Sequence, residues 1–179
     1  MKRRKKTAVK DRISQTVLNL FKEKNISDIR ISEVTEKAQV ARASFYRNFG
    51  SFDDVLEYIA DGYVNAFSEQ YLPLLYNGNY DTWYEKVKEI LGTILEKKDS
   101  INDTLTNNLR IVFYKFEQKI VLNPNHIWSM DPYKKYEHVA KISAFYSVCC
   151  EWIKDGAKES IDDMAAFIVT NILLNAKVA

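Results

Sequence analysis

The chain has 179 residues, of which 46% are hydrophobic and 28% are charged. This composition suits one or two globular domains and excludes disordered and fibrous proteins. Only five glycines and three prolines occur, so turn residues are scarce and helices are favoured over hairpins. We therefore expect an all-α protein. The two cysteines, Cys149 and Cys150, are neighbours and cannot build a disulfide framework, so we expect a reducing, cytoplasmic setting.

Charge is distributed unevenly along the chain. The total is +2, but up to Leu56 there are thirteen Lys or Arg residues against seven Asp or Glu residues, and the remainder is acidic. A basic N-terminal third indicates an end that meets a polyanion, although a solvated basic tail is an ordinary alternative. The basic residues Lys2–Lys6 are not followed by an apolar run, so no signal peptide is expected. No stretch reaches the ~18 apolar residues of a membrane span, so no membrane partner is expected either.

Apolar residues at helical spacing predict four helices in the first 71 residues. The first runs over 9–24 and ends at Asn25, and the second is a short helix over 29–38. The third covers 42–49, with Phe45 and Phe49 on one face. Ser51 is expected to cap a long fourth helix that continues to residue 71.

The remaining residues predict four further helices and one long loop. The helices cover 81–98, 101–122, 133–154 and 160–177, with a break considered near Asn107-Asn108 in the second of them. The loop lies between residues 123 and 132. No internal repeat interrupts this series.

The third predicted helix carries groups that suit a DNA groove. Its polar residues alternate around the two phenylalanines and offer guanidinium, hydroxyl, phenol and amide groups. Arg can bond guanine and Asn can bond adenine, while Ser and Tyr reach phosphate oxygens. Two short helices joined by a short turn and preceded by a longer helix also form the helix-turn-helix arrangement.

The stretch 31–49, ISEVTEKAQVARASFYRNF, resembles the DNA-binding signature of the TetR/AcrR transcriptional regulators. The resemblance covers roughly residues 10–56. It implies an all-α homodimer of about nine helices that binds a palindromic operator in double-stranded DNA. It further implies a helix-turn-helix domain with a basic arm over 1–52, and a helical effector-binding and dimerisation domain over 53–179.

The same resemblance assigns roles to individual residues. It implies that Phe45 and Phe49 are core residues. The residues that it places at the DNA, together with the basic arm, are Arg30, Ser32, Arg42, Ala43, Ser44, Tyr46, Arg47, Asn48, Lys5 and Lys6.

Three positions depart from the family pattern. Gln39 stands where the turn usually has glycine, and Ala41 replaces the usual Ser or Thr cap, a loss of about 1 kcal/mol of helix stability. Phe52 stands where a lysine commonly meets a phosphate. These departures shift DNA binding toward Lys2–Lys6, and they motivate a second hypothesis, a helical ligand-binding or interaction module that reads no DNA sequence.

The C-terminal region, from FYSVCCEWIKDG at 145–156 through the final helix, resembles regulators akin to the dihydroxyacetone-kinase operon activator. The last helix is apolar almost all round and must be covered twice, as in a four-helix dimer interface. The predicted interface residues are Val139, Ile142, Tyr146, Cys149, Ile153, Ile161, Met164, Ile168 and Ile172.

Aromatic residues gather in the middle of the chain. A cavity lined by aromatic faces suits an apolar, flat or cationic small molecule of unknown identity, although an aromatic at helical spacing is more often core. The predicted pocket residues are Phe67, Tyr71, Trp83, Phe113, Tyr114, Phe116 and Trp128.

Catalytic and metal sites find little support in the sequence. His126 and His138 have no partner at metal-ligand spacing, so no metal or other cofactor is expected. No phosphate-binding glycine loop or nucleophile elbow occurs, so we predict no enzyme. The adjacent cysteines are interpreted as buried small hydrophobes, with a thiol sensor as the alternative. The sequence therefore predicts a ligand-responsive DNA-binding regulator, of the repressor kind.

Overall fold

The computed structural model describes residues 2–71, 74, 78–121 and 133–174, and the side chains of 7–71, 74, 78–120 and 133–174. Every regular element in these residues is helical, which confirms the all-α prediction. Eight α-helices lie within the described residues, where about nine were expected for the whole chain.

The chain divides into two compact units. The N-terminal unit comprises Met1–Val64 and Asn102–Phe116, and the C-terminal unit comprises Asn65–Ile101 and Glu117–Ala179. These units differ from a split at residue 52, because the segment 102–116 joins the N-terminal helices. The division into a DNA-binding and an effector-binding domain remains a prediction.

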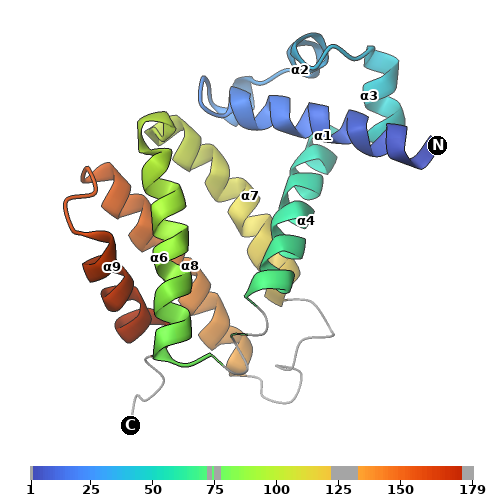
Figure 1. The fold of residues 1–179 in the computed structure, drawn as a ribbon. Helices are drawn as coiled ribbons and strands as arrows, with labels where there is room; N and C mark the ends of the chain where they lie inside the picture. The colour runs from blue at the N-terminus through green and yellow to red at the C-terminus, as the bar shows by residue number, and fades with distance from the viewer. Residues whose placement is uncertain (1, 72–73, 75–77, 122–132, 175–179) are drawn as a thin grey trace. The chain divides into compact units, whose positions relative to one another are not determined.

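The N-terminal unit is built on three helices that pack pairwise (Figure 1). They are α1 (Lys2–Leu20), α2 (Ile31–Lys37) and α3 (Arg42–Asn48), with the 3-10 turn η1 (Ile26–Asp28) before α2. The unit also holds the start of α4 (Phe52–Gln70) and most of α7 (Asp103–Val121). The side chains on the inner faces of these helices are buried, among them Ile13, Val17, Leu20, Val34, Phe45, Val55, Leu56 and Val112, and so is Phe21 in the turn after α1.

Two details of these helices differ from the sequence prediction. The backbone of Lys2–Lys6 is helical, so α1 begins well before Val9 rather than after a separate arm. Helix α7 runs without a break past Asn107-Asn108. Asparagine favours breaks when its side chain competes for its own helix backbone, but the side chain of Asn108 bonds to backbone atoms outside α7.

The C-terminal unit holds α6 (Tyr80–Glu96), the 3-10 turn η2 (Lys98–Ser100), α8 (Lys134–Lys154) and α9 (Ile161–Ile168). Helix α9 is followed by a π-helical stretch, η4 (Val169–Leu173), where the sequence predicted one continuous helix. Helix α6 packs along α9 and η4. The core formed there contains Trp83, Val87, Leu91, Cys149, Trp152, Met164, Ala165, Ile168 and Val169.

Local signals explain where these helices begin and end. Ser160 caps α9, because its Oγ accepts the N–H of Asp163 at 3.1 Å. Asn79 and Thr82 form a capping box at the start of α6. Gly156, with a φ of 88°, follows α8 in the left-handed conformation that ends a helix.

Candidate nucleic-acid interface

The turn between α2 and α3 contains a residue in a strained backbone conformation. Gln39 has a φ of 53°, in the left-handed region that glycine adopts without cost. The next N–H, of Val40, donates to the carbonyl of Thr35 at 3.0 Å and closes the end of α2. The sequence prediction that Gln39 must accept the turn's backbone angle is therefore confirmed.

We expect Gln39→Gly to raise the free energy of unfolding of the N-terminal unit by about 0.5–1 kcal/mol. Glycine removes the clash of Cβ at positive φ, and this gain exceeds the added entropy of the unfolded chain. Chemical denaturation followed by circular dichroism measures the change. Glu36→Gly, in the exposed part of α2, is the matched control and should destabilise, because the φ there is helical.

Helix α3 begins without a side-chain cap. Ala41 occupies the N-cap position with extended backbone and makes no side-chain hydrogen bond. The carbonyl of Ala41 accepts the N–H of Phe45 at 3.1 Å, so the first turn is closed by backbone alone. This confirms the uncapped start that the sequence predicted.

One face of α3 is fixed to the protein by two aromatic rings. Phe45 is fully buried and Phe49, the C-cap residue, is 3% exposed. Their ring centroids lie 5.9 Å apart, and Phe49 meets Tyr58 of α4 edge-on at 5.7 Å. The prediction that both phenylalanines are core residues is confirmed, and their burial orients the opposite face outward.

The opposite face of α3 is polar and open to solvent. Arg42, Ala43, Tyr46 and Arg47 are exposed, and Tyr46 is 47% exposed. The guanidinium of Arg42 lies 5.8 Å from the ring centroid of Tyr46, a cation–π distance. These four residues form what we call the α3 outer face.

The other residues predicted to bind DNA differ in their exposure to solvent. Ser44 and Asn48 are half-buried. The Nδ2 of Asn48 donates to the carbonyl of Ser44 at 2.7 Å, and its Oδ1 is buried without a hydrogen-bond partner in the described residues. The Asn48 amide, which was predicted to bond adenine, is thus turned toward its own helix.

Ser44 also forms a hydrogen bond with an arginine of the same helix. Its Oγ accepts a hydrogen bond from the guanidinium of Arg47 at 2.7 Å. At the start of α2, Arg30 is the exposed N-cap residue and Ser32 is exposed in the first turn. The side chains of Lys5 and Lys6 lie outside the described residues, although their backbone belongs to α1.

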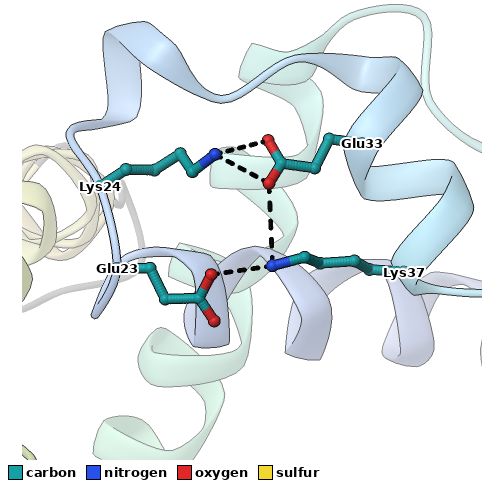
Figure 2. Close-up of polar contacts among 4 residues, drawn as sticks. All are labelled: Glu23, Lys24, Glu33 and Lys37. Carbon is teal, nitrogen blue, oxygen red and sulfur yellow. Dashed lines mark hydrogen bonds and ion pairs between the residues drawn. The ribbon is translucent and has the colours of Figure 1, made fainter.

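Four charged side chains tie the turn after α1 to α2 (Figure 2). The Nζ of Lys24 donates to both carboxylate oxygens of Glu33, at 2.8 and 3.0 Å. The Nζ of Lys37 bonds Glu23 at 2.8 Å and lies 3.7 Å from Glu33. The hydrogen bond from Lys24 is the main reason why the pKa of Glu33 is lowered. Lys37 is therefore engaged within the protein, although its charge would otherwise suit a phosphate.

The start of α4 is capped as the sequence predicted, and it is also tied to α1. The Oγ of Ser51 accepts the N–H of Asp54 at 3.2 Å, and the Asp54 carboxylate accepts the N–H of Gly50 at 2.7 Å. The bond from Gly50 is the main cause of the lowered pKa of Asp54. Toward α1, the hydroxyl of Tyr58 donates to Asp11 at 2.8 Å. The bond from Tyr58 holds α4 against α1.

Helix α7 also contacts α4 within the N-terminal unit. The Nζ of Lys115 lies 2.9 Å from Asp53 and 2.7 Å from Glu57. The two acidic residues follow Phe52, which is half-buried as the first residue of α4. Sequence reasoning missed this contact, because Lys115 is 62 positions from Asp53 and 58 from Glu57, and neither segment carries a motif.

The predicted pocket residues fall into two groups. Phe67, Tyr71 and Trp83 belong to the C-terminal unit, Phe113, Tyr114 and Phe116 belong to the N-terminal unit, and Trp128 lies outside the described residues. The rings of Phe67 and Tyr71 stack with centroids 5.4 Å apart, and the Nζ of Lys86 lies 5.3 Å from the Tyr71 ring. Trp83 is buried in the core, which is the alternative that the sequence left open for each aromatic.

Within the N-terminal unit the three aromatic residues differ in burial. Phe116 is buried and its ring centroid lies 5.7 Å from that of Phe113. Tyr114 is 60% exposed and lines no core. The pocket as a whole remains a prediction.

The predicted dimer residues differ in burial, and the interface remains a prediction. Cys149, Met164 and Ile168 are buried in the core of the C-terminal unit. Ile153, Ile161 and Ile172 are partly buried against the same core, and Val139, Ile142 and Tyr146 are half-buried along α8. Phe167, which the prediction omitted, is 49% exposed on α9.

Cysteine and histidine residues offer no clustered metal ligands in the described part of the chain. No group of three or more His, Cys, Asp or Glu residues is arranged there to hold a metal ion. Burial raises the pKa of Cys149 to about 12, which disfavours the reactive thiolate, and Cys150 is half-buried. His138 is half-buried in α8, and His126 lies outside the described residues. Among the described helices, none is long and apolar enough to cross a membrane.

Comparison with known proteins identifies the N-terminal helices. Residues 15–59 match the family model described as bacterial regulatory proteins, tetR family. The chain is also similar to an uncharacterized HTH-type transcriptional regulator, YxbF, of Bacillus subtilis (strain 168), with 24% identity over 161 residues. That similarity covers 83% of this chain and 40% of the relative, so the chain spans less than half of the relative's length. No solved structure matches the chain. Residues 15–59 are therefore similar to the helix-turn-helix domain of the tetR family of bacterial regulatory proteins.

Proposed function

We propose that the protein is a ligand-responsive repressor that binds a palindromic operator as a homodimer and is released by a small apolar or aromatic effector. The α3 outer face is the observation that carries the proposal. Two arginines and an exposed tyrosine stand on a helix whose other side is fixed by Phe45 and Phe49. A rigid helix with outward guanidinium groups is what direct reading of base edges in a major groove requires.

Dimerisation follows from the geometry of DNA. A seven-residue recognition helix contacts only a few base pairs, so a second copy is needed to specify an operator. Two copies read successive major grooves when their α3 helices are ~34 Å apart. Apolar groups left open on the C-terminal unit support a partner chain of the same kind, above all Phe167 at 49% and Leu174 at 38% exposure.

We expect Phe167→Glu to shift the protein from dimer to monomer, because the change places a charge in an apolar contact. A loss of about 2–4 kcal/mol of association free energy corresponds to a dissociation constant raised roughly 30- to 1,000-fold. Sedimentation equilibrium measures the shift. Ser100→Glu, an exposed change of equal charge, is the control. A Phe167→Glu protein that remains as dimeric as wild type would remove α9 from the proposed interface.

The effector is proposed to bind near the aromatic residues of the C-terminal unit. Stacked Phe67 and Tyr71 provide a flat aromatic surface of the kind that binds planar ligands. Binding of the effector then weakens binding of DNA, and binding of DNA weakens binding of the effector, by the same coupling free energy of about 1–3 kcal/mol.

Selection of bound sequences from a random duplex library tests the proposal directly. The purified protein is used at two salt concentrations, because phosphate contacts make affinity salt-dependent. Recovery of one palindrome with half-sites about one helical turn apart supports the dimeric regulator. Recovery of only salt-sensitive binding without sequence preference would favour the ligand-binding module that reads no DNA sequence.

A further inference from the structure

A buried asparagine of α7 holds the turn that follows α1. Asn108 is 2% exposed, and its amide makes three hydrogen bonds to the backbone of that turn. Its Nδ2 donates to the carbonyls of Phe21 and Lys24, at 3.1 and 2.8 Å, and its Oδ1 accepts the N–H of Ile26 at 2.9 Å. All these atoms belong to the N-terminal unit.

A second asparagine of the same segment reinforces this contact. The Nδ2 of Asn102 donates to the carbonyl of Lys22 at 3.0 Å, while its Oδ1 accepts the N–H of Leu105 and caps α7. Carbonyls near the end of a helix lack partners within it, so an outside donor is worth more there than at the helix centre. The backbone of residues 21–26 is thus bonded both to Asn102, just before α7, and to Asn108 within it.

The position of this turn decides where the DNA-reading helices lie. Helix α1 ends at Leu20, η1 begins at Ile26 and α2 begins at Ile31, so the turn sets the direction in which α2 and then α3 leave α1. We propose that Asn108 is a positioning residue for DNA reading. It holds the turn through α7 and contacts no DNA itself. This inference rests on the proposed function.

The chemistry of the contact favours one side chain. An asparagine amide supplies two N–H donors and one acceptor oxygen from a single short group. A carboxylate has the same shape but only acceptors, so it would face two backbone carbonyls with negative charge. Asn108→Asp therefore removes the contact with little change in volume, and Asn108→Ala removes it without adding charge.

The test measures operator affinity and selectivity of full-length variants. The probes are the duplex recovered by selection and an unrelated duplex of equal length. We expect Asn108→Asp and Asn108→Ala to weaken operator binding by about tenfold or more, with a much smaller change for the unrelated duplex. Asn107→Asp, at the exposed neighbouring asparagine, is the matched control and should change operator affinity and selectivity little.

A pH profile separates positioning from general destabilisation. The carboxyl introduced by Asn108→Asp is buried beside carbonyls, so its pKa is raised above the ordinary value. As the pH falls through that pKa, the protonated group regains one donor. Operator affinity should then recover in part, by more than it changes in Asn107→Asp. Protonation also restores stability by the same linkage, so the affinities are compared only at pH values where circular dichroism shows both variants to be folded.

Hydrogen exchange at the Ile26 amide tests the contact without DNA. We expect this amide to be protected in wild type and to exchange faster in Asn108→Ala. Equal exchange in the two proteins, or unchanged operator affinity and selectivity in both Asn108 variants, overturns the proposal. If Asn108→Asp does not fold, Asn108→Ala decides. A wild-type protein that recovers no preferred duplex would refute the proposed function, and the Ile26 comparison would still decide whether Asn108 holds the turn.

Discussion

Phe45→Ala is expected to lower the free energy of unfolding of the N-terminal unit by about 3–5 kcal/mol. Phe45 is fully buried, and its ring meets those of Tyr46 and Phe49 at 5.5 and 5.9 Å. Alanine leaves a cavity that a seven-residue helix with no side-chain cap cannot close without moving. Operator affinity should fall as well, because α3 loses the anchor of its inner face.

Two spectroscopic probes separate the units in this experiment. Every tryptophan of the sequence, at positions 83, 128 and 152, lies outside the residues of the N-terminal unit. Circular dichroism of Phe45→Ala should show helix melting at lower denaturant, while tryptophan fluorescence reports the C-terminal unit. Phe45→Leu is the control and should cost less than about 1.5 kcal/mol. A loss below about 1 kcal/mol for Phe45→Ala would contradict the burial of the ring.

The sequence was sufficient to predict the features that local chemistry decides. Periodicity located α2, α3 and α4, because a face with Phe45 and Phe49 four residues apart must be helical and buried. The cap at Ser51 was predicted for the same reason, since a cap involves residues three apart. The positive φ of Gln39 followed from the resemblance, because the family usually has glycine at that place in the turn.

Contacts between distant segments were not predictable in this way. The bonds of Asn108 to Phe21 and Lys24 join residues more than eighty positions apart, and no local pattern marks them. The same limit applies to the predicted dimer residues of the last helix. A helix that is apolar all round does not reveal which face packs inside the protomer itself. The structure assigns Met164 and Ile168 to the inside and leaves Phe167 on the outside.

The polar network of Figure 2 shows why charge alone does not identify DNA contacts. Lys24 and Lys37 stand in the basic third of the chain, yet both pair with glutamates of the same unit. Exposed ion pairs of this kind add little stability, but they hold a lysine away from other anions. The two arginines of the α3 outer face lie beside a serine hydroxyl and a tyrosine ring rather than a carboxylate, and are therefore better candidates for base contacts than the count of basic residues suggests.

Arg42→Ala is expected to weaken operator binding by about 1–3 kcal/mol and to relax the preference at one base pair of each half-site. The guanidinium stands on the exposed face of α3, 5.8 Å from the Tyr46 ring, so the aromatic ring helps to orient it. Tyr46→Ala should therefore lose affinity too. The double variant should lose less than the sum of the two single losses, because the residues act as a pair.

Binding titrations on the selected operator and on its single-base variants measure these losses. Lys22→Ala removes one exposed positive charge from the same unit and is the matched control. It should weaken all duplexes alike, by reducing the electrostatic attraction without changing the base preference. If Arg42→Ala behaved as this control does, the guanidinium would be a phosphate contact and base reading would rest on the rest of the α3 outer face. Strict additivity in the double variant would show that Tyr46 and Arg42 act independently on DNA.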